Sequence, residues 1–334
     1  MSTDNNTLRR PSDQWSLHQA VTPLTIGVLL IIALLAAFSA KNMELDKAVS
    51  ETGQAISSMF GFGESKVLNG VGNFVGKAFP IQISTIQETN RIENFDPNDL
   101  PMFSYVEVRT EREYSVISEK FTETEAEFLV KPIGYLIKVL IKMWETIEMA
   151  FWGTVFSIMI AIPLTIFGAS NYTPHKILYH SARAICSFNR AMPELILALF
   201  FVLMYGFGPV AGILALAIHT SGFLGKFFAD EIENCDPGPQ RALTATGANK
   251  LKVLRYAVIP QVLPQYYAYI QYIMERNIRT ATVLGIVGAG GIGTELKGRW
   301  DLFDYDHVAT ILLIIFITVV LLELFTQRLR NKSI

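Results

Sequence analysis

Charge and cysteine are both scarce in this chain of 334 residues. Only 17% of its residues are charged and 51% are hydrophobic, a balance too apolar for a soluble domain of this length. The two cysteines, Cys186 and Cys235, form no Cys-x-x-Cys pair, so neither a disulfide framework nor a zinc site is indicated, and both are interpreted as packing residues. The net charge of -2 and the lack of a basic stripe with interleaved aromatics argue against nucleic-acid binding.

Catalytic motifs are missing as well. The chain has no G-x-x-x-x-G-K-[ST] phosphate loop, so any ATP hydrolysis belongs to a different chain. Without Gly-x-Ser-x-Gly, His-Glu-x-x-His or a paired catalytic aspartate pattern, an intramembrane hydrolase is not favoured. The segment 288–293 does satisfy G-x-G-x-x-G, but that fingerprint needs a βαβ unit around it. Because it ends a hydrophobic run, close backbone packing or a gate hinge is predicted at Gly288, Gly290, Gly291 and Gly293.

What the chain does have is a series of long apolar runs. A run of about 20 apolar residues is enough to cross a hydrocarbon core as a helix. The predicted fold is therefore an all-α polytopic membrane protein with about six transmembrane helices, at 19–40, 149–174, 186–205, 209–228, 262–286 and 307–326. An amphipathic helix starting near Pro132 leads into the second span. For the first run, a cleaved signal peptide is the alternative, although the apolar stretch is long for one.

The orientation follows from the short flanks, because cytoplasmic loops collect Lys and Arg. Basic residues lie in the N-terminal segment 1–18, between spans two and three, between spans four and five, and after span six, where the chain closes with the tail 331–334. All of these flanks fall on the same side. We therefore expect a multi-pass membrane protein with both termini in the cytoplasm and residues 41–131 outside.

The outer segment divides into two parts. Residues 45–80 place glycines among small apolar residues and suit an amphipathic stretch along the membrane surface. Residues 81–128 are polar, and alternation near Tyr105 to Thr110 has the strand period, which predicts a small extracytoplasmic β element. A disordered acidic loop is the alternative.

A polar, basic element at 236–260 separates the fourth and fifth spans. Asp236 is suited to cap a short helix that runs toward Thr246, Gly247 allows a turn, and Asn249 is suited to start a second helix. Lys250 begins a basic face that ends before Pro260. Such a helix pair can rotate as a rigid body when it is pushed; an ordinary basic loop is the alternative.

This element carries a resemblance to a known family. Ala242, Gly247 and Pro260 match the spacing of the E-A-A-x3-G-x9-I-x-L-P coupling loop of ABC importer permeases. The chain departs from that motif with Arg241 in place of Glu, Leu243 in place of the second Ala, and Ala257 in place of Ile.

The resemblance extends beyond the loop. From near Glu145 to the C-terminal region, the chain is similar to the permease subunit of phosphonate ABC importers, whereas residues 81–128 look like an insertion. The segments that carry this similarity are 209–220, 236–239, 246–250, 263–265 and 277–293. The resemblance implies that residues 132–330 form a type I ABC importer permease domain.

The family implies a homodimer of this chain, two copies of an ABC ATPase subunit in the cytoplasm, and a periplasmic or surface binding protein that delivers the ligand. ATP and Mg would be bound by the ATPase, so the chain itself needs no cofactor or metal and performs no covalent chemistry. Transport would follow alternating access. The resemblance assigns coupling to the ATPase to Asp236, Arg241, Ala242, Gly247, Lys250 and Pro260. Permeases for phosphite, phosphate or methionine are the nearest alternatives, and a secondary transporter is a more distant one.

Ionisable residues inside the spans are candidates for the translocation pathway, because a charge at bilayer depth is costly. Glu275 and Arg279 lie four residues apart and predict an ion pair; the functional hypothesis is that Arg279, with Asn277, attracts a phosphonate anion. His219 is interpreted first as a hydrogen-bonded packing residue. The full candidate set is Arg190, Glu194, His219, Glu275, Arg276, Asn277 and Arg279.

Overall fold

The computed structural model describes residues 23–43, 45–60, 64–92, 95–97, 100–101, 103–115 and 120–333. The N-terminal segment 1–18 and the beginning of the predicted first span lie outside the described residues, as does Ile334. The chain divides into two compact units, residues 1–75 and 76–334, which are treated separately.

The regular elements among the described residues of the first unit are helices. Helix α1 (Pro23–Asn42) is apolar over almost its whole length, α2 (Leu45–Met59) follows it, and α3 (Lys66–Ala78) begins in this unit. In α2, Leu45, Val49 and Ile56 share one face and are all at least half exposed. An exposed apolar face opposite a polar one is typical of a helix that lies on a membrane surface.

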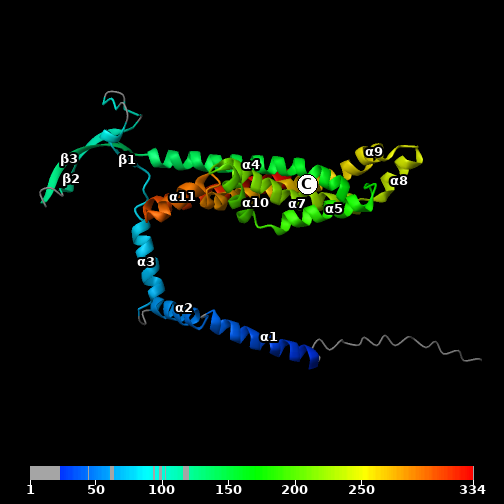
Figure 1. Ribbon diagram of the computed structural model, residues 1–334, viewed down its shortest axis with the longest axis horizontal. Coiled ribbons are helices and arrows are strands. Elements are labelled where there is room, and N and C mark those ends of the chain that lie inside the picture. The colour runs from blue at the N-terminus through cyan, green and yellow to red at the C-terminus, as the bar shows by residue number, and fades with distance from the viewer. Residues whose placement is uncertain are drawn as a thin grey trace, which may run out of the picture. The chain divides into compact units, whose positions relative to one another are not determined.

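The second unit is a bundle of long helices with a sheet at one end (Figure 1). Its helices are α4 (Gly134–Gly168), α5 (Lys176–Ala191), α6 (Glu194–Tyr205), α7 (Pro209–Asn234), α8 (Pro237–Ala245), α9 (Lys250–Val253), α10 (Ile259–Leu284), α11 (Ile292–Asp301) and α12 (Tyr305–Ser333). A π-helical turn, Leu254–Val258, joins α9 to α10, and a 3-10 turn, Gly285–Val287, follows α10.

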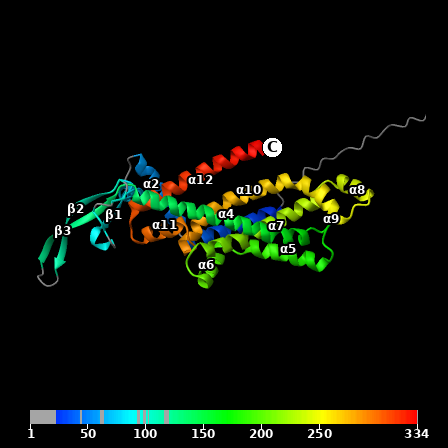
Figure 2. The same cartoon turned by 90° about the horizontal axis from the view of Figure 1, so that it is seen from above.

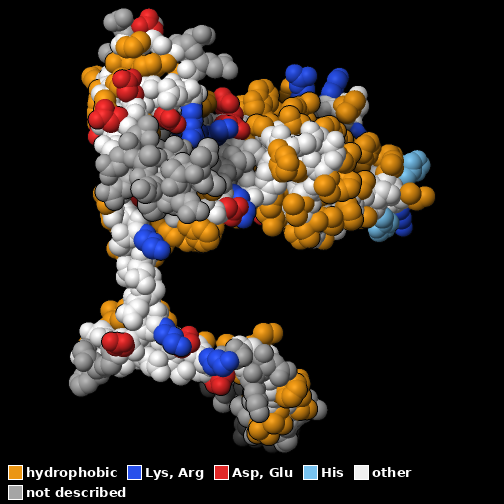
Figure 3. Space-filling view, turned by 60° about the vertical axis from the view of Figure 1, so that its left-hand side comes forward, with side chains coloured by type: hydrophobic (Ala, Val, Ile, Leu, Met, Phe, Trp, Pro, Cys, Tyr) orange, Lys and Arg blue, Asp and Glu red, His pale blue; other side chains and the backbone are white. Residues whose placement is uncertain are grey.

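Small residues bring the central helices together. A side chain at Gly153 of α4 would come within 2.8 Å of Leu216 of α7, so only glycine permits this approach. Around this contact, α4, α7, α10 and α12 close a core that includes Val139, Leu216 and Ile311, each of which is fully buried. On the face drawn in Figure 3, exposed hydrophobic side chains cover much of the bundle, which suits contact with lipid.

Three described helices are long and apolar enough to cross a membrane: α4, α7 and the part of α12 from Tyr305 to Arg328. The number rises to five if the two bent pairs, α1 with α2 and α5 with α6, each count as one span. Helix α10, the predicted fifth span, is 26 residues long but is not among them, because its polar residues lower its hydropathy.

Two spans differ from their predicted form. The predicted entry helix and second span are one continuous helix, α4, of 35 residues that passes through Pro163. The predicted third span begins ten residues earlier than expected, at Lys176, and is broken: α5 and α6 meet at 90° next to Pro193. Proline cannot continue the hydrogen-bond ladder of the preceding helix, which accounts for the break.

The polar segment forms an antiparallel three-stranded sheet in the order β1-β3-β2, with β1 (Thr85–Glu88), β2 (Tyr105–Ser115) and β3 (Lys120–Lys131), and a 3-10 turn at Thr89–Arg91. The strand predicted near Tyr105 to Thr110 is therefore confirmed. Strand β3 leads directly into α4, and Leu129 and Val130 are buried. Both views place the sheet and the α8–α9 pair at opposite ends of α4 (Figures 1 and 2).

Candidate functional site

The predicted helix-glycine-helix element is present. Asp236 caps α8: its carboxylate accepts a hydrogen bond of 2.9 Å from the backbone N–H of Gly238. Gly247 adopts φ +80°, a left-handed conformation that allows the turn. Asn249 then caps α9 by accepting a 2.9 Å hydrogen bond from the N–H of Lys252. Pro260 lies in the first turn of α10.

This element projects from the bundle but is firmly attached at its base. Helix α8 has no buried residue. By contrast, Val253 and Val258 are buried, and Val258 packs with Ala229 of α7 and Val262 of α10. The π-helical turn carries the chain from α9 into α10 without a loop.

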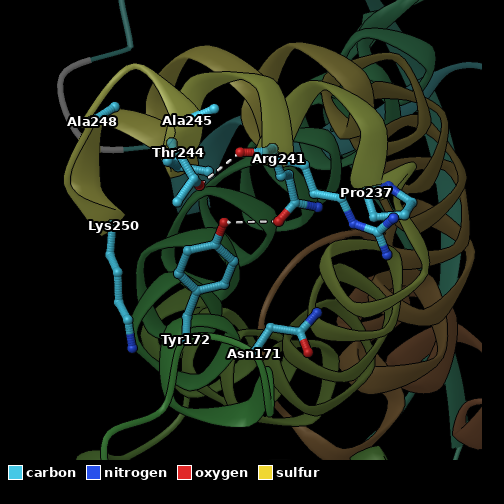
Figure 4. Close-up of a pocket in the computed structure, with 10 residues that line it drawn as sticks. Asn171, Tyr172, Pro237, Arg241, Thr244, Ala245, Ala248 and Lys250 are labelled. Atoms are coloured by element: carbon cyan, nitrogen blue, oxygen red, sulfur yellow. Dashed lines mark hydrogen bonds between the residues drawn. The ribbon is translucent and has the colours of Figure 1, made fainter.

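A cavity of about 620 Å³ opens between this element and the loop after α4 (Figure 4). Tyr172 points across it and donates a 3.4 Å hydrogen bond to the side chain of Gln240. Arg241 and Lys250 are exposed at its edge, so the cavity presents positive charge to the solvent. The lining residues are Asn171, Tyr172, Pro237, Gln240, Arg241, Thr244, Ala245, Ala248, Lys250 and Val253.

A second group of polar residues gathers at the break between α5 and α6. Glu194 lies in the first turn of α6, where the positive end of the helix dipole favours a carboxylate. Facing it is His219 of α7, which is 4% exposed and whose Nδ1 lies 2.9 Å from the carbonyl oxygen of Met192. The predicted hydrogen-bonded packing of His219 is confirmed.

Arg276 of α10 completes this group. One of its terminal nitrogens lies 3.0 Å from Nε2 of His219 and 3.9 Å from Glu194. Since the Met192 carbonyl can only accept, Nδ1 of His219 carries the proton, and in the neutral ring Nε2 accepts from Arg276. The guanidinium also lies 4.6 Å from the centroid of the Phe223 ring, which is a cation–π contact. We call Glu194, His219 and Arg276 the kink cluster.

The other pathway candidates lie around this cluster or away from it. Arg190 adjoins it, 5.6 Å from the same Phe223 ring. The predicted ion pair between Arg279 and Glu275 is present, at 2.7 Å. Asn277 is 1% exposed and donates a 2.9 Å hydrogen bond to Thr154 of α4. Residues two apart on a helix point in different directions, so Asn277 is not brought to Arg279.

A smaller cavity of about 330 Å³ links Arg279 to the kink cluster. Glu194 and its neighbours at the start of α6 form one wall, and the last turns of α10 form the other. The lining residues are Pro193, Glu194, Leu195, Arg279, Thr280, Val283 and Leu284. Sequence reasoning did not anticipate it, because it depends on the angle between α5 and α6.

The glycine loop before α11 is closely packed. Gly288, Gly290 and Gly291 have φ of +89°, +88° and +72°, which strongly favours glycine. Two side chains of α4 hold the loop: Glu145 accepts a 2.9 Å hydrogen bond from the N–H of Gly291, and Thr146 accepts one of 2.8 Å from Ile292. These two partners were missed by sequence reasoning because they lie 146 residues away in the chain.

An ionic network ties α11 to both neighbouring helices at the end of the bundle that carries the sheet. Burial opposes ionisation of Glu295, but hydrogen bonds from Lys138 and Arg299 outweigh it and lower the pKa of Glu295. Burial likewise opposes ionisation of Asp304, yet hydrogen bonds from His307 and Arg299 lower its pKa to about 2. Folding lowers both pKa values, so the two ionised carboxylates stabilise the folded protein at pH values above the ordinary carboxylate pKa. That stabilisation is lost as the pH falls through the pKa values of the folded state.

Within that network, Asp304, Asp306 and His307 hold their ligand atoms within 4.8 Å of one another, a spacing that a metal ion also requires. Arg299 already supplies positive charge there, at 2.6 Å from Asp304. The donors are thus paired within the protein, and their chemistry fits an ionic lock better than a metal centre.

The chain was compared with known protein families. The family model described as "Binding-protein-dependent transport system inner membrane component" matches residues 149–332. The match begins inside α4 and includes the α8–α9 pair, the kink cluster and the glycine loop.

Curated relatives and solved structures agree with this match. The chain is 49% identical over 261 residues, 77% of its length and all of the relative's, to the putative phosphite transport system permease protein HtxE of Stutzerimonas stutzeri. It is 45% identical over 121 residues, 36% of the chain and 99% of the relative, to the putative cryptic phosphonate transport system permease protein PhnE2 of Escherichia coli. In fold it is similar to a chain of the inward-facing MetNI methionine ABC transporter, with a TM-score of 0.52 at 22% identity over 60% of this chain and 98% of that one.

Proposed function

The chain belongs to the binding-protein-dependent transport system inner membrane component family and is a permease subunit of an ABC importer, and on that premise we propose that its cargo is a phosphorus oxyanion, phosphite or a phosphonate. The names of HtxE and PhnE2 support this cargo class. The two ligands share a tetrahedral phosphorus with anionic oxygens, which guanidinium groups bind well. Phosphate and methionine remain the alternative cargoes.

The single observation that carries the mechanism is the exposed, basic α8–Gly247–α9 element, which continues into α10. A separate ATPase would dock at the 620 Å³ cavity, and its motion would be passed on through the π-helical turn. Asp236, Arg241, Ala242, Gly247, Lys250 and Pro260 are the proposed coupling residues. ATP and Mg would be bound by that partner, and the permease would alternate its access without chemistry of its own.

The proposed assembly is a homodimer of this chain with two ATPase subunits and an external binding protein. Six crossings are obtained if α1, α4, the α5–α6 pair, α7, α10 and α12 each span the inner membrane. Helix α10 would tolerate its charges because Glu275 pairs with Arg279, and Arg276 is held by other helices. With α8 and α9 in the cytoplasm, their location opposite the sheet supports an external sheet. Six crossings would then put both termini on the cytoplasmic side.

The test is reconstitution of the permease in proteoliposomes with the ATPase and binding protein encoded beside it. We expect ATP-dependent accumulation of phosphite or methylphosphonate that requires the binding protein. Phosphate and methionine, offered at the same concentration, measure selectivity. Accumulation driven by an ion gradient without ATP would identify a secondary transporter instead, and ATP-driven uptake of methionine alone would contradict the cargo.

Replacing Arg279 with Gln is expected to abolish uptake while the complex still assembles. Arg279 is about half exposed and lines the smaller cavity, so it is suited to attract an anion. Lys297→Gln is the matched control, because Lys297 also forms an exposed pair with a carboxylate four residues away but does not line that cavity. The measurement is the initial rate of uptake at several ligand concentrations; transport at normal affinity in the Arg279 variant contradicts the role.

A further inference from the structure

The kink cluster lies deep in the bundle. Helix α7 has 26 residues, and His219 is ten residues after Pro209, which places it about 15 Å along a helix of about 39 Å. Glu194 lies at the same level, because its carboxylate is 3.4 Å from Nε2 of His219. This estimate places the cluster near the middle of a hydrocarbon core about 30 Å thick.

Ionisable groups at that depth are costly, because a charged side chain loses its hydration there. The cluster and its surroundings nevertheless hold five of them: three cations, Arg190, Arg276 and Arg279, and two carboxylates, Glu194 and Glu275. With His219 neutral, one positive charge is left over. A monoanion entering the smaller cavity would balance it.

Arg276 has two close partners and one more distant one. His219 is 3.0 Å away, and the Phe223 ring supports the flat side of the guanidinium, so these two contacts fix its position. Glu194 is only a loose partner at 3.9 Å, the longest ion pair at the cluster. Its carboxylate is 30% exposed and lines the 330 Å³ cavity, so it can turn away from Arg276 without unpacking the core.

The cavity has room for a small oxyanion. Its volume is about ten times the roughly 30 Å³ occupied by one water molecule in the liquid, so a phosphorus oxyanion and several waters fit together. The anion would lie between Arg279 on one wall and the start of α6 on the other. There the backbone N–H groups of the first turn of α6 and the helix dipole also favour negative charge.

We propose that Glu194 is an internal substitute for the cargo: its carboxylate neutralises Arg276 while the cavity is empty and gives way to a phosphorus oxyanion during transport. The anion then binds Arg276 at the break between α5 and α6, and Glu194 expels it again by returning. This inference rests on the proposed function, and it explains why a carboxylate lies next to a site for an anion. Weak, reversible binding is what a transporter needs.

The test uses the complete permease–ATPase complex in detergent without its binding protein, with phosphite and methylphosphonate as probes. Glu194→Gln removes the competing charge and is expected to tighten equilibrium binding of the probe at least tenfold while slowing ATP-driven uptake, because release becomes slow. Arg276→Gln is expected to lose both binding and uptake. Asp301→Asn, which removes a carboxylate that pairs with Lys297 and does not line this cavity, is the matched control and is expected to change binding less than threefold.

Glu194→Asp keeps the charge on a side chain one methylene shorter and provides a second variant in case Glu194→Gln does not assemble. It is expected to tighten binding to a smaller extent. If an assembled Glu194 variant binds the probe no more tightly than the wild type does, while the wild-type complex transports the probe, the substitute-anion role is wrong. The proposed function then still stands. Wild-type complex that transports neither probe overturns the proposed function and the inference together.

Discussion

The permease variant Ala245→Trp is expected to reach the membrane in normal amounts but to lose at least nine tenths of its ATP-driven uptake. Ala245 is the last residue of α8, is exposed, and lines the 620 Å³ cavity. An indole at this position fills space that a docked ATPase would need. A loss of about 1.4 kcal/mol in docking free energy is enough for a tenfold effect.

Leu251→Trp is the control for this variant. Leu251 is 74% exposed on α9 and does not line the cavity, so the same bulky side chain there is expected to leave uptake near the wild-type rate. Co-purification of the ATPase with the permease, measured beside uptake, separates failed docking from failed transport. If Leu251→Trp abolishes co-purification and Ala245→Trp does not, the ATPase docks on a different face of the element.

Gly293→Val is expected to prevent accumulation of the permease in the membrane. A Cβ atom at Gly293 would clash with the carbonyl oxygen of Thr282 and would lie 2.8 Å from the Cα atom of Gly285. These neighbours are backbone atoms, so no side-chain movement relieves the clash, and α11 would be forced away from α10. Overpacking of this kind costs about 1–3 kcal/mol or more.

Gly298→Val provides the comparison on the same helix. Nothing lies within 4 Å of a Cβ atom at Gly298, and valine has a higher helix propensity than glycine, so this substitution is expected to leave α11 in place. The amount of full-length protein in isolated membranes and its thermal unfolding in detergent are the measurements. Normal accumulation of Gly293→Val would show that α10 and α11 separate easily, which is the behaviour of a gate hinge and not of fixed packing.

The local parts of the site could be predicted because their causes lie within a few residues. Asp236 and Asn249 cap their helices through hydrogen bonds that span two and three positions, and Gly247 turns the chain through its own φ. The ion pair of Glu275 and Arg279 follows from helical spacing alone. The break at Pro193 was missed because the predicted third span was drawn straight through this proline, although Arg190 and Glu194 flank it.

The sequence by itself determined that this protein lies in a membrane, where its apolar helices run, and that a capped basic helix pair interrupts them. Only the tertiary structure decided which buried charges meet. Glu194, His219 and Arg276 come from three different helices, whereas Asn277, next to Arg276 in the chain, faces α4. The physical reason is helix packing: a side chain at Gly222 would come within 2.6 Å of the backbone of α5, so this glycine allows α5 and α7 to approach closely where Met192 meets His219.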